Sequence, residues 1–390
     1  MIPADWAIVA GYFAYFGAVG IFQPYFPLHL AALGISAAEI GALLALWNGV
    51  RVVGPVVAAS LADARPDRRP LLRVLAFASV GATAFLAAAR SLPAIAIGLA
   101  LLSLCFNGLM PVYDAHALER LGPRVHRYGR LRLWGSIGFV ATSVGLGWLT
   151  ARTGPAVIPL ALLVAVLATA FALLALPAAT ARAHRAAGLA EFAAALRRPR
   201  VVVFLVVCFL HLAGFAGFYG FYSLYLAHVG YQPGTIGLLW AAGVVAEIGL
   251  FAFGQSLLRR YPLPRLLEVA LAASVLRWAL VAVFPDAPGL MVGAQLLHAA
   301  SFGLFHAVTV LLGPALMPAG TAARAQALVS SLGWGAGGIA GSLLAGALWD
   351  GVGPRAVFAG SAVLAGLAWL LAARGLSQPT GRGSAANQLG

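Results

Sequence analysis

The sequence predicts an all-α membrane protein in which twelve transmembrane helices form two pseudo-symmetric six-helix bundles. Three observations predict this fold class: a very apolar composition, twelve apolar stretches, and a repeat that relates the two halves. Of the 390 residues, 62% are hydrophobic and only 9% are charged, and the mean hydropathy is +0.93. Soluble domains carry about 25% charged residues. A soluble fold, a nucleic-acid-binding protein and a disordered chain are therefore disfavoured, despite the net charge of +14.

A helix needs about 20 apolar residues to cross a bilayer. Twelve stretches satisfy this length: 6–32, 37–61, 71–89, 94–117, 131–152, 156–176, 201–228, 234–258, 265–284, 288–313, 325–349 and 355–373. They lack the period-two alternation of barrel strands, so helices are expected. The first stretch has no basic segment before it, and we therefore expect no cleavable signal peptide.

The basic residues are distributed unequally between the two sides of the predicted membrane. All 25 are arginines, and with both termini in the cytoplasm 19 of them fall in inner loops and tails. The outer loops hold only Arg90, Arg152 and Arg355. This asymmetry follows the positive-inside rule, so both termini are expected to be cytoplasmic. The net charge thus indicates topology and contact with lipid headgroups, with no nucleic-acid partner.

A polar stretch divides the chain into two halves. The expected parts are an N-terminal bundle (1–176), a cytoplasmic linker (177–200), a C-terminal bundle (201–374) and a flexible cytoplasmic tail (375–390). Short motifs repeat between the halves in the same order. The matches are Gly34-Ile35-Ser36 with Gly230-Tyr231-Gln232, Leu133-Trp134-Gly135 with Gly333-Trp334-Gly335, and Gly154-Pro155 with Gly353-Pro354. Parallel repeats imply a two-fold pseudo-axis along the membrane normal and a site between the halves.

Ionisable residues inside the apolar stretches are the main candidates for function, because such groups are costly near the bilayer centre. Arg51 and Glu247 are separated by 196 residues, which is also the offset between the Gly34 and Gly230 motifs. We expect them at equivalent depths, facing a central cavity where their charges balance. The alternative is that each pairs with a neighbour inside its own half.

Polar and aromatic stripes follow several of the predicted helices. In the tenth stretch, residues spaced by three and four share one face, which favours a wet cavity and proton handling over simple core hydrogen bonds. These residues are Gln295, His298, Phe302, His306 and Thr309. Aromatic stripes in the first and seventh stretches are typical either of helix packing or of an apolar substrate pocket. The two cysteines, Cys105 and Cys208, lie in apolar runs, and we expect no disulfide, metal or cofactor.

The whole chain resembles the major facilitator superfamily, and within it the proton-coupled 3-phenylpropionate transporters. The most specific match is Tyr128-Gly129-Arg130-Leu131-Arg132-Leu133-Trp134-Gly135-Ser136-Ile137-Gly138-Phe139. Further matches are Pro111-Val112-Tyr113-Asp114, Gly243-Val244-Val245-Ala246-Glu247, Arg277-Trp278 and Gln295-Leu296-Leu297-His298. Loop 59–69 resembles the superfamily's gating motif but has Ala59 in place of glycine and Pro66 where glycine is common.

The resemblance extends more distantly to lactose permease and implies roles for the buried charges. The substrate-binding carboxylate and arginine of that family match Asp114 and Arg132, and its helix-8 glutamate, helix-9 arginine and helix-10 histidine match Glu247, Arg277 and His298. Two positions depart from that pattern. Phe139 replaces the sugar-stacking tryptophan, and Ser301 replaces a carboxylate, so galactoside recognition is disfavoured.

Together the residues and the resemblance predict proton-coupled symport of a small organic substrate, such as an aromatic carboxylate like phenylpropionate, by alternating access. The predicted proton-coupling residues are Glu247, His298, Arg277 and Asp114. The predicted substrate-binding residues are Arg51, Arg132, Asp114, Asn48, Asn107, Phe26, Gln23, Phe139, Tyr219, Tyr222, Trp240 and Gln295. The predicted gating residues are Asp63, Arg65, Arg68 and Arg69. The expected setting is a monomer in the bacterial inner membrane.

Three other function classes compete with this prediction. A sugar or nucleoside symporter would use the same coupling, and a drug-efflux antiporter is a weaker alternative. An integral-membrane enzyme is disfavoured, because the sequence has no His-x-x-x-His pair, no Gly-x-Ser-x-Gly elbow and no Gly-rich phosphate loop followed by lysine.

Overall fold

Twelve helices in the described residues are long and apolar enough to cross a membrane, which confirms the predicted fold class. The computed structural model describes residues 6–63, 65, 67–178, 189–318 and 321–376, and none of these lies in a strand. The elements, in chain order, are α1 (Trp6–Ala32), α2 (Ala37–Asp63), α3 (Arg69–Ala88), α4 (Leu92–Leu121), η2 (Gly122–Arg127), α5 (Tyr128–Thr153), η3 (Pro155–Val157), α6 (Ile158–Leu174), α7 (Leu189–Ala195), α8 (Pro199–Val229), α9 (Pro233–Phe253), α10 (Gln255–Arg260), α11 (Leu263–Val283), α12 (Pro288–Leu296), η4 (Ala299–Leu304), α13 (Phe305–Ala315), α14 (Ala322–Val329), η5 (Ser330–Gly337), α15 (Gly338–Gly351) and α16 (Pro354–Gly375).

The repeated sequence motifs mark equivalent helix ends. Gly34 and Gly230 follow α1 and α8 and both have positive φ angles, +80° and +105°. Glycine adopts this conformation without the steric penalty that a Cβ atom would bring, so it ends the helix and turns the chain. Each glycine is soon followed by the helix that returns across the membrane, α2 or α9. The repeat detected in the sequence is therefore a repeat of a helix–turn–helix unit.

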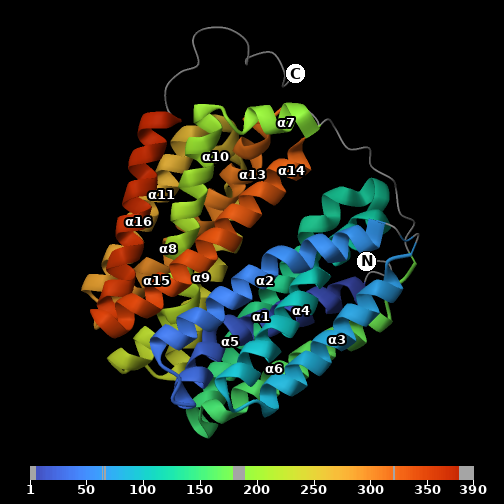
Figure 1. The fold of residues 1–390 in the computed structure, drawn as a ribbon, viewed down its shortest axis with the longest axis vertical. Coiled ribbons are helices and arrows are strands. Elements are labelled where there is room, and N and C mark those ends of the chain that lie inside the picture. The colour runs from blue at the N-terminus through green and yellow to red at the C-terminus, as the bar shows by residue number, and fades with distance from the viewer. Residues whose placement is uncertain (1–5, 64, 66, 179–188, 319–320, 377–390) are drawn as a thin grey trace.

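The six helices of each half pack in the same pattern. In the N-terminal half α1 packs on α5 and α6, and α3 packs on α4 and α6. In the C-terminal half α8 packs on α15 and α16, and α11 packs on η4 and α16. Between the halves, the equivalent pairs α2 with α15 and α9 with α5 are in contact. Figure 1 shows the resulting two bundles, with the blue-green N-terminal helices inclined against the green-red C-terminal ones.

The halves close against each other at one end of the molecule. We call it the arginine-poor end and define it by the loops 33–36, 89–91, 230–232, 284–287 and 352–353. There the carboxylate of Asp350 accepts a hydrogen bond of 2.8 Å from the backbone N–H of Ala38. The hydroxyl of Tyr25 donates to the carbonyl of Ser143 at 2.6 Å and lies 3.3 Å from the carbonyl of Pro233. From this end the bundles diverge toward α14 (Figure 1).

Two predicted helices contain a segment with wider turns. The stretches expected at 288–313 and 325–349 are interrupted by π-helical turns, η4 and η5. Such turns leave one residue out of the regular hydrogen-bond ladder and often occur at functional sites. Gly333, Gly337 and Gly341 lie in or beside η5, and a Cβ atom at any of them would contact α8 closely. This confirms the close helix packing that their spacing predicts.

The predicted cytoplasmic linker contains one short helix, α7. Its residues Ala195 and Phe192 pack in a small apolar cluster with Val201, Met317 and Ala325. α7 is therefore attached to the C-terminal half. The predicted tail, 375–390, lies almost entirely outside the described residues.

Candidate functional site

A cavity of about 510 Å³, part of it open to the outside, lies between the two halves. Its walls come from α1, α2, α8, η5 and α15, so both halves contribute. The lining residues are Phe22, Gln23, Pro27, Leu44, Trp47, Asn48, Arg51, Leu212, Ala216, Tyr219, Gly220, Trp334, Gly338 and Ser342. Four of the predicted substrate-binding residues, Arg51, Asn48, Gln23 and Tyr219, are among them.

Arg51 is the charged residue in this lining. Its guanidinium stacks on the ring of Trp334, 5.1 Å from the ring centroid, and this contact joins α2 to η5 across the halves. Among the described residues no carboxylate or carbonyl lies within hydrogen-bond distance of the Arg51 guanidinium. Beside it, the amide nitrogen of Asn48 donates to the hydroxyl of Ser342 at 3.3 Å, again across the halves. The cavity thus holds a cation whose hydrogen-bond donors are free for a ligand.

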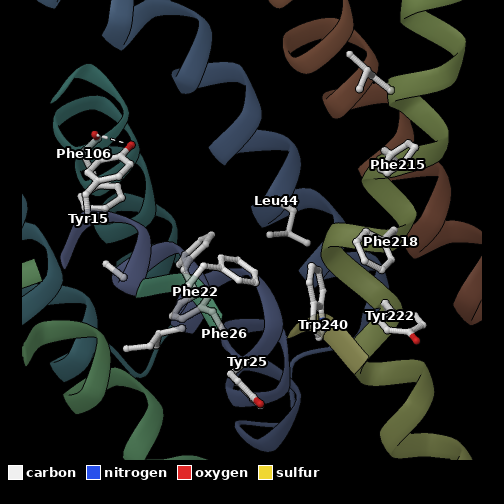
Figure 2. Close-up of a cluster of buried hydrophobic side chains, with 14 of the residues drawn as sticks. Tyr15, Phe22, Tyr25, Phe26, Leu44, Phe106, Phe215, Phe218, Tyr222 and Trp240 are labelled. Atoms are coloured by element: carbon white, nitrogen blue, oxygen red, sulfur yellow. Dashed lines mark hydrogen bonds between the residues drawn. The ribbon is translucent and has the colours of Figure 1, made fainter. Parts of the chain in front are cut away.

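Aromatic rings form a large part of the wall, but only some of the predicted rings are among them. Phe22 stacks on Trp47 with ring centroids 4.2 Å apart, and on its other side it stacks on Phe26 at 5.0 Å. Phe26 is only 1% exposed and supports Phe22 from behind instead of lining the cavity. Figure 2 shows Phe22 and Phe26 on one side and the α8 rings of Phe218 and Tyr222 on the other.

The remaining predicted ring residues lie in the packed layer next to the cavity. Trp240 is 3% exposed, and its indole N–H donates to the hydroxyl of Ser223 at 2.9 Å. The Trp240 ring lies 4.4 Å from Phe218 and 6.3 Å from Phe139 of the other half. Tyr222 is fully buried. These residues do not line the cavity; Trp240 and Phe139 meet across the halves, whereas the ring contacts of Tyr222 lie within its own half.

In the C-terminal half, three of the four predicted proton-coupling residues meet. The Nε2 atom of His298 lies 3.5 Å from a carboxylate oxygen of Glu247. The other ring nitrogen of His298 lies 2.8 Å from a guanidinium nitrogen of Arg277. A carboxylate, an imidazole and a guanidinium are thus connected by contacts. The chain runs from Glu247 on α9 through His298, the residue just before η4, to Arg277 on α11.

Arg277 is fully buried and is held by several partners in addition to His298. Its guanidinium donates to Gln295 Oε1 at 3.1 Å and to Ser301 Oγ at 3.3 Å, and it lies 4.4 Å from the ring centroid of Phe218. Ser301 occupies the position where the lactose permease pattern has a carboxylate. The backbone carbonyl of Ser301 also contacts Nε2 of His211 at 3.1 Å. A buried cation with this many partners is fixed in place.

The fourth predicted proton-coupling residue, Asp114, lies in the N-terminal half. One of its carboxylate oxygens accepts hydrogen bonds from the hydroxyls of Tyr12 at 2.6 Å and Tyr128 at 2.8 Å. The neighbouring Arg132 stacks over the ring of Phe16, 4.0 Å from its centroid. Asp114 and the Glu247 chain are thus two separate acidic centres, one in each half.

Arg51 and Glu247 lie on equivalent helices, α2 and α9, as the repeat predicts. Their surroundings differ, however. Glu247 contacts His298 inside its own half, whereas Arg51 contacts a ring of the other half. The expected mutual charge balance is therefore not a direct contact, and the alternative of a partner within the same half holds for Glu247 alone.

Asn107 and the predicted gating loop lie away from the cavity lining. Asn107 donates to Ser103 at 3.0 Å, and Ser103 in turn donates to the carbonyl of Trp47 at 2.8 Å, so this pair links α4 to α2. In the loop, Arg68 forms an ion pair with Glu119 of α4. Two other predicted gating residues contact residues close to them in the chain: Arg69 pairs with Asp67, and Arg65 donates to the carbonyl of Leu61. The side chain of the fourth, Asp63, lies outside the described residues.

Sequence reasoning missed several residues of the site. Trp334 lines the cavity and Tyr128 holds Asp114, yet neither was predicted to have a role, and Phe22 was considered only as part of the aromatic stripe of the first stretch. For Trp334 a signal existed, because the match between Leu133-Trp134-Gly135 and Gly333-Trp334-Gly335 repeats a tryptophan in the two halves. For Tyr128 only the fold shows that the start of α5 approaches α4.

Comparisons with known proteins identify the family. The profile described as "MFS_1 like family" matches residues 6–360. The chain is 30% identical over 306 residues to "Probable 3-phenylpropionic acid transporter" of Escherichia coli (strain K12), covering 77% of this chain and 79% of that protein. It is 26% identical over 330 residues to "Maltose permease" of Geobacillus stearothermophilus, covering 84% and 83%.

The fold is also that of solved transporters. The crystal structure of the nucleoside transporter NupG superposes with a TM-score of 0.80 at 18% identity, covering 95% of this chain and 98% of that one. At this identity the likeness concerns the fold alone. The family and these relatives are transporters and not enzymes. The chain therefore belongs to the MFS_1-like family and is a multi-pass membrane transporter of the major facilitator type.

Proposed function

We propose that this transporter carries a small aromatic carboxylate together with a proton, by alternating access of the central cavity. The observation that carries the proposal is the Arg51 guanidinium, which lines the cavity without a carboxylate partner among the described residues. An unpaired cation at membrane depth is costly and marks a functional site. A transported anion would supply the missing charge.

The cavity is suited to a carboxylate that carries a ring. A guanidinium binds a carboxylate through two parallel hydrogen bonds. Around Arg51, the rings of Phe22, Trp47, Tyr219 and Trp334 offer apolar, polarisable surfaces for an aromatic group. The relative named as a probable 3-phenylpropionic acid transporter supports the same substrate class.

Glu247 is the proposed proton site, and His298 and Arg277 position it. The carboxylate lies at the end of the chain Arg277–His298–Glu247, with its side chain 20% exposed and therefore open to water. A proton on Glu247 removes one negative charge, and a substrate carboxylate on Arg51 removes one positive charge. The loaded carrier thus crosses its conformational change with both interior charges compensated, which lowers the cost of burying them.

The proposed orientation in the membrane follows from the arginine asymmetry. If the arginine-rich end faces the cytoplasm, the positive-inside rule is obeyed and both termini are cytoplasmic. The closed arginine-poor end then faces outward, and the cavity opens inward in this conformation. Uptake into the cell would begin in an outward-open conformation and end in this inward-open one. We place the protein in a bacterial inner membrane and expect it to act as a monomer.

Uptake of radiolabelled phenylpropionate into proteoliposomes, with and without an inward proton gradient, tests the proposal. We expect gradient-driven accumulation by the wild type, a large loss for Arg51→Gln with partial activity for Arg51→Lys, and loss of accumulation for Glu247→Gln. Glu247→Gln should still exchange internal for external substrate, because binding does not need the proton site to be ionised. Arg152→Gln, an exposed arginine far from the cavity, is the matched control.

Two results would count against the proposal. Accumulation that persists in Glu247→Gln and after the gradient is collapsed would exclude this proton site. Unchanged transport by Arg51→Gln would exclude the proposed anion site.

A neutral sugar or nucleoside is the second candidate substrate. Gln23, Asn48 and Ser342 place amide and hydroxyl groups in the same cavity, and they could bind hydroxyl groups of a ligand. The maltose permease relative favours this class. A panel of aromatic acids, disaccharides and nucleosides in a thermal-shift assay separates the two, because only the aromatic acids should lose their effect in Arg51→Gln.

A further inference from the structure

A second cavity opens on the outer side of the N-terminal half, away from the central one. It lies at the arginine-poor ends of α1, α3 and α6 and has an empty volume of about 650 Å³, including space open to the outside. The residues lining it are His29, Leu33, Ala87, Arg90, Ala156, Pro159, Leu160 and Leu163. Arg90 is basic and His29 is titratable, and the other lining residues are apolar. No residue of this cavity takes part in the proposed transport site.

The equivalent loops of the C-terminal half carry an exposed ion pair. There Arg355 follows the Gly353-Pro354 motif, and its guanidinium lies 3.6 Å from the carboxylate of Asp286 in the loop between α11 and α12. In the N-terminal half Ala156 follows the matching Gly154-Pro155 motif. Ala156 therefore stands where the other half has the arginine of this ion pair.

The acidic partner is also missing from the N-terminal half. The loop between α3 and α4, equivalent to the loop that carries Asp286, carries Arg90. One guanidinium nitrogen of Arg90 donates to the carbonyls of Ala87 at 2.8 Å and Ala89 at 2.9 Å, which holds the group at the cavity. Among the described residues no carboxylate pairs with it. The C-terminal half thus has a neutral pair where the N-terminal half has an uncompensated cation.

His29 adds a second polar group on the wall. It is 7% exposed, so its imidazole is nearly enclosed at the cavity wall. An imidazole nitrogen can donate a hydrogen bond to a ligand. Arg90 and His29 together form a site for a single anionic group.

The apolar walls show what else the ligand must carry. Leu160 of the membrane-spanning helix α6 is 60% exposed, and Leu33 in the loop after α1 is 36% exposed. A small soluble anion would leave these side chains uncovered, whereas an amphiphile would cover them. We propose that this cavity binds an anionic phospholipid, with its phosphate on Arg90 and His29 and its acyl chains along Leu33, Leu160 and Leu163.

Lipid-dependent thermal unfolding of the purified full chain in dodecyl maltoside tests this site. Tryptophan fluorescence is recorded during titration with palmitoyl-oleoyl phosphatidylglycerol, with the phosphatidylcholine of the same chains as a neutral comparison. We expect a saturable rise in melting temperature with phosphatidylglycerol. Arg90→Gln should require about fivefold more lipid for the same rise, since one basic residue contributes about that factor at a membrane surface.

Two variants make the test specific. Arg90→Asp combined with Ala156→Arg copies the ion pair of the C-terminal half into the cavity, so this double variant should fold normally and lose the saturable response. Arg152→Gln removes an exposed arginine from the same end of the same half and should respond like the wild type. The double variant keeps the test valid even if Arg90→Gln folds poorly.

The following outcomes would overturn the proposal: an equal response to phosphatidylcholine, an unchanged response in the double variant, or a rise of the same size with soluble glycerol phosphate. The last result would identify a site for free anions instead of lipid. None of these outcomes depends on transport activity, so they are independent of the proposed function.

Discussion

Replacing Gly237 with alanine should destabilise the conformation in which the arginine-poor end is closed. Gly237 lies near the start of α9, where this helix contacts α5 of the other half. A Cβ atom added there would meet the backbone carbonyl of Ser143 and the hydroxyl of Tyr25 at distances that real Cβ atoms do not show. Neither group can move aside easily, because one is helix backbone and the other is fully buried and hydrogen-bonded.

The size of the effect follows from this contact. Carbon atoms pack at about 3.5–4.0 Å, so α9 and α5 would have to separate by roughly 1 Å. Overpacking of this kind costs about 1–3 kcal/mol. Because the added methyl group has no such neighbour once the halves separate, the cost falls on the closed state alone. The equilibrium should therefore shift toward the opposite conformation by about 5- to 150-fold.

Gly249→Ala is the matched control, because Gly249 lies on the same helix and a Cβ atom there would have nothing within 4 Å. Spin labels at Leu33 and Val352, which lie in loops of different halves at the arginine-poor end, report the separation by double electron–electron resonance. In a background without Cys105 and Cys208, the wild type and Gly249→Ala should give one short distance. Gly237→Ala should add a second, longer distance between the two spin labels. A distance distribution identical to that of Gly249→Ala would refute the reasoning.

Three smaller effects should also be measurable. Asp350→Ala removes the acceptor for the Ala38 N–H and should shift the same distance distribution in the same direction, by an equilibrium factor corresponding to about 1 kcal/mol. In a double-mutant cycle on thermal stability, Arg68→Gln and Glu119→Gln should show coupling, because their ion pair is largely shielded from solvent; additive effects would contradict this. The hydrogen bond from Arg69 holds the pKa of Asp67 below its ordinary value. Asp67→Asn should therefore be less stable than the wild type above the unfolded aspartate pKa, and the difference should vanish as pH falls through the lowered pKa.

The sequence was sufficient to predict the helices, because membrane helices satisfy a simple length and polarity rule. It also singled out Arg277, His298 and Glu247, since buried charges are rare in such a composition and each stands out; the resemblance to lactose permease is what grouped the three as one predicted proton-coupling set. The offset of 196 residues placed Arg51 and Glu247 on equivalent helices. These results depend on local features of the chain, and local features are what a sequence displays directly.

The surroundings of each charge could not be predicted in the same way. Whether Glu247 contacts Arg51 of the other half or His298 of its own half depends on how the helices are rotated and packed against one another, and the pattern within one helix carries no information on that packing. The same holds for Phe26, which shares a helix face with the cavity-lining Phe22 but lies behind it. Interruptions such as η4 and η5 add to the difficulty, because a π-helical turn rotates all residues after it relative to the expected face.

The two acidic centres and the guanidinium of Arg51 in the cavity differ in how they are held. Asp114 is bound by tyrosines and Glu247 by His298, each within one half, so their contacts survive a movement of the halves. Arg51 instead contacts Trp334 of the opposite half. A ligand anion bound at Arg51 would therefore lie between surfaces that must separate when access alternates. Occupation of this position would be coupled to the conformational change by geometry, whereas a proton on Glu247 would act by removing a buried charge within one half.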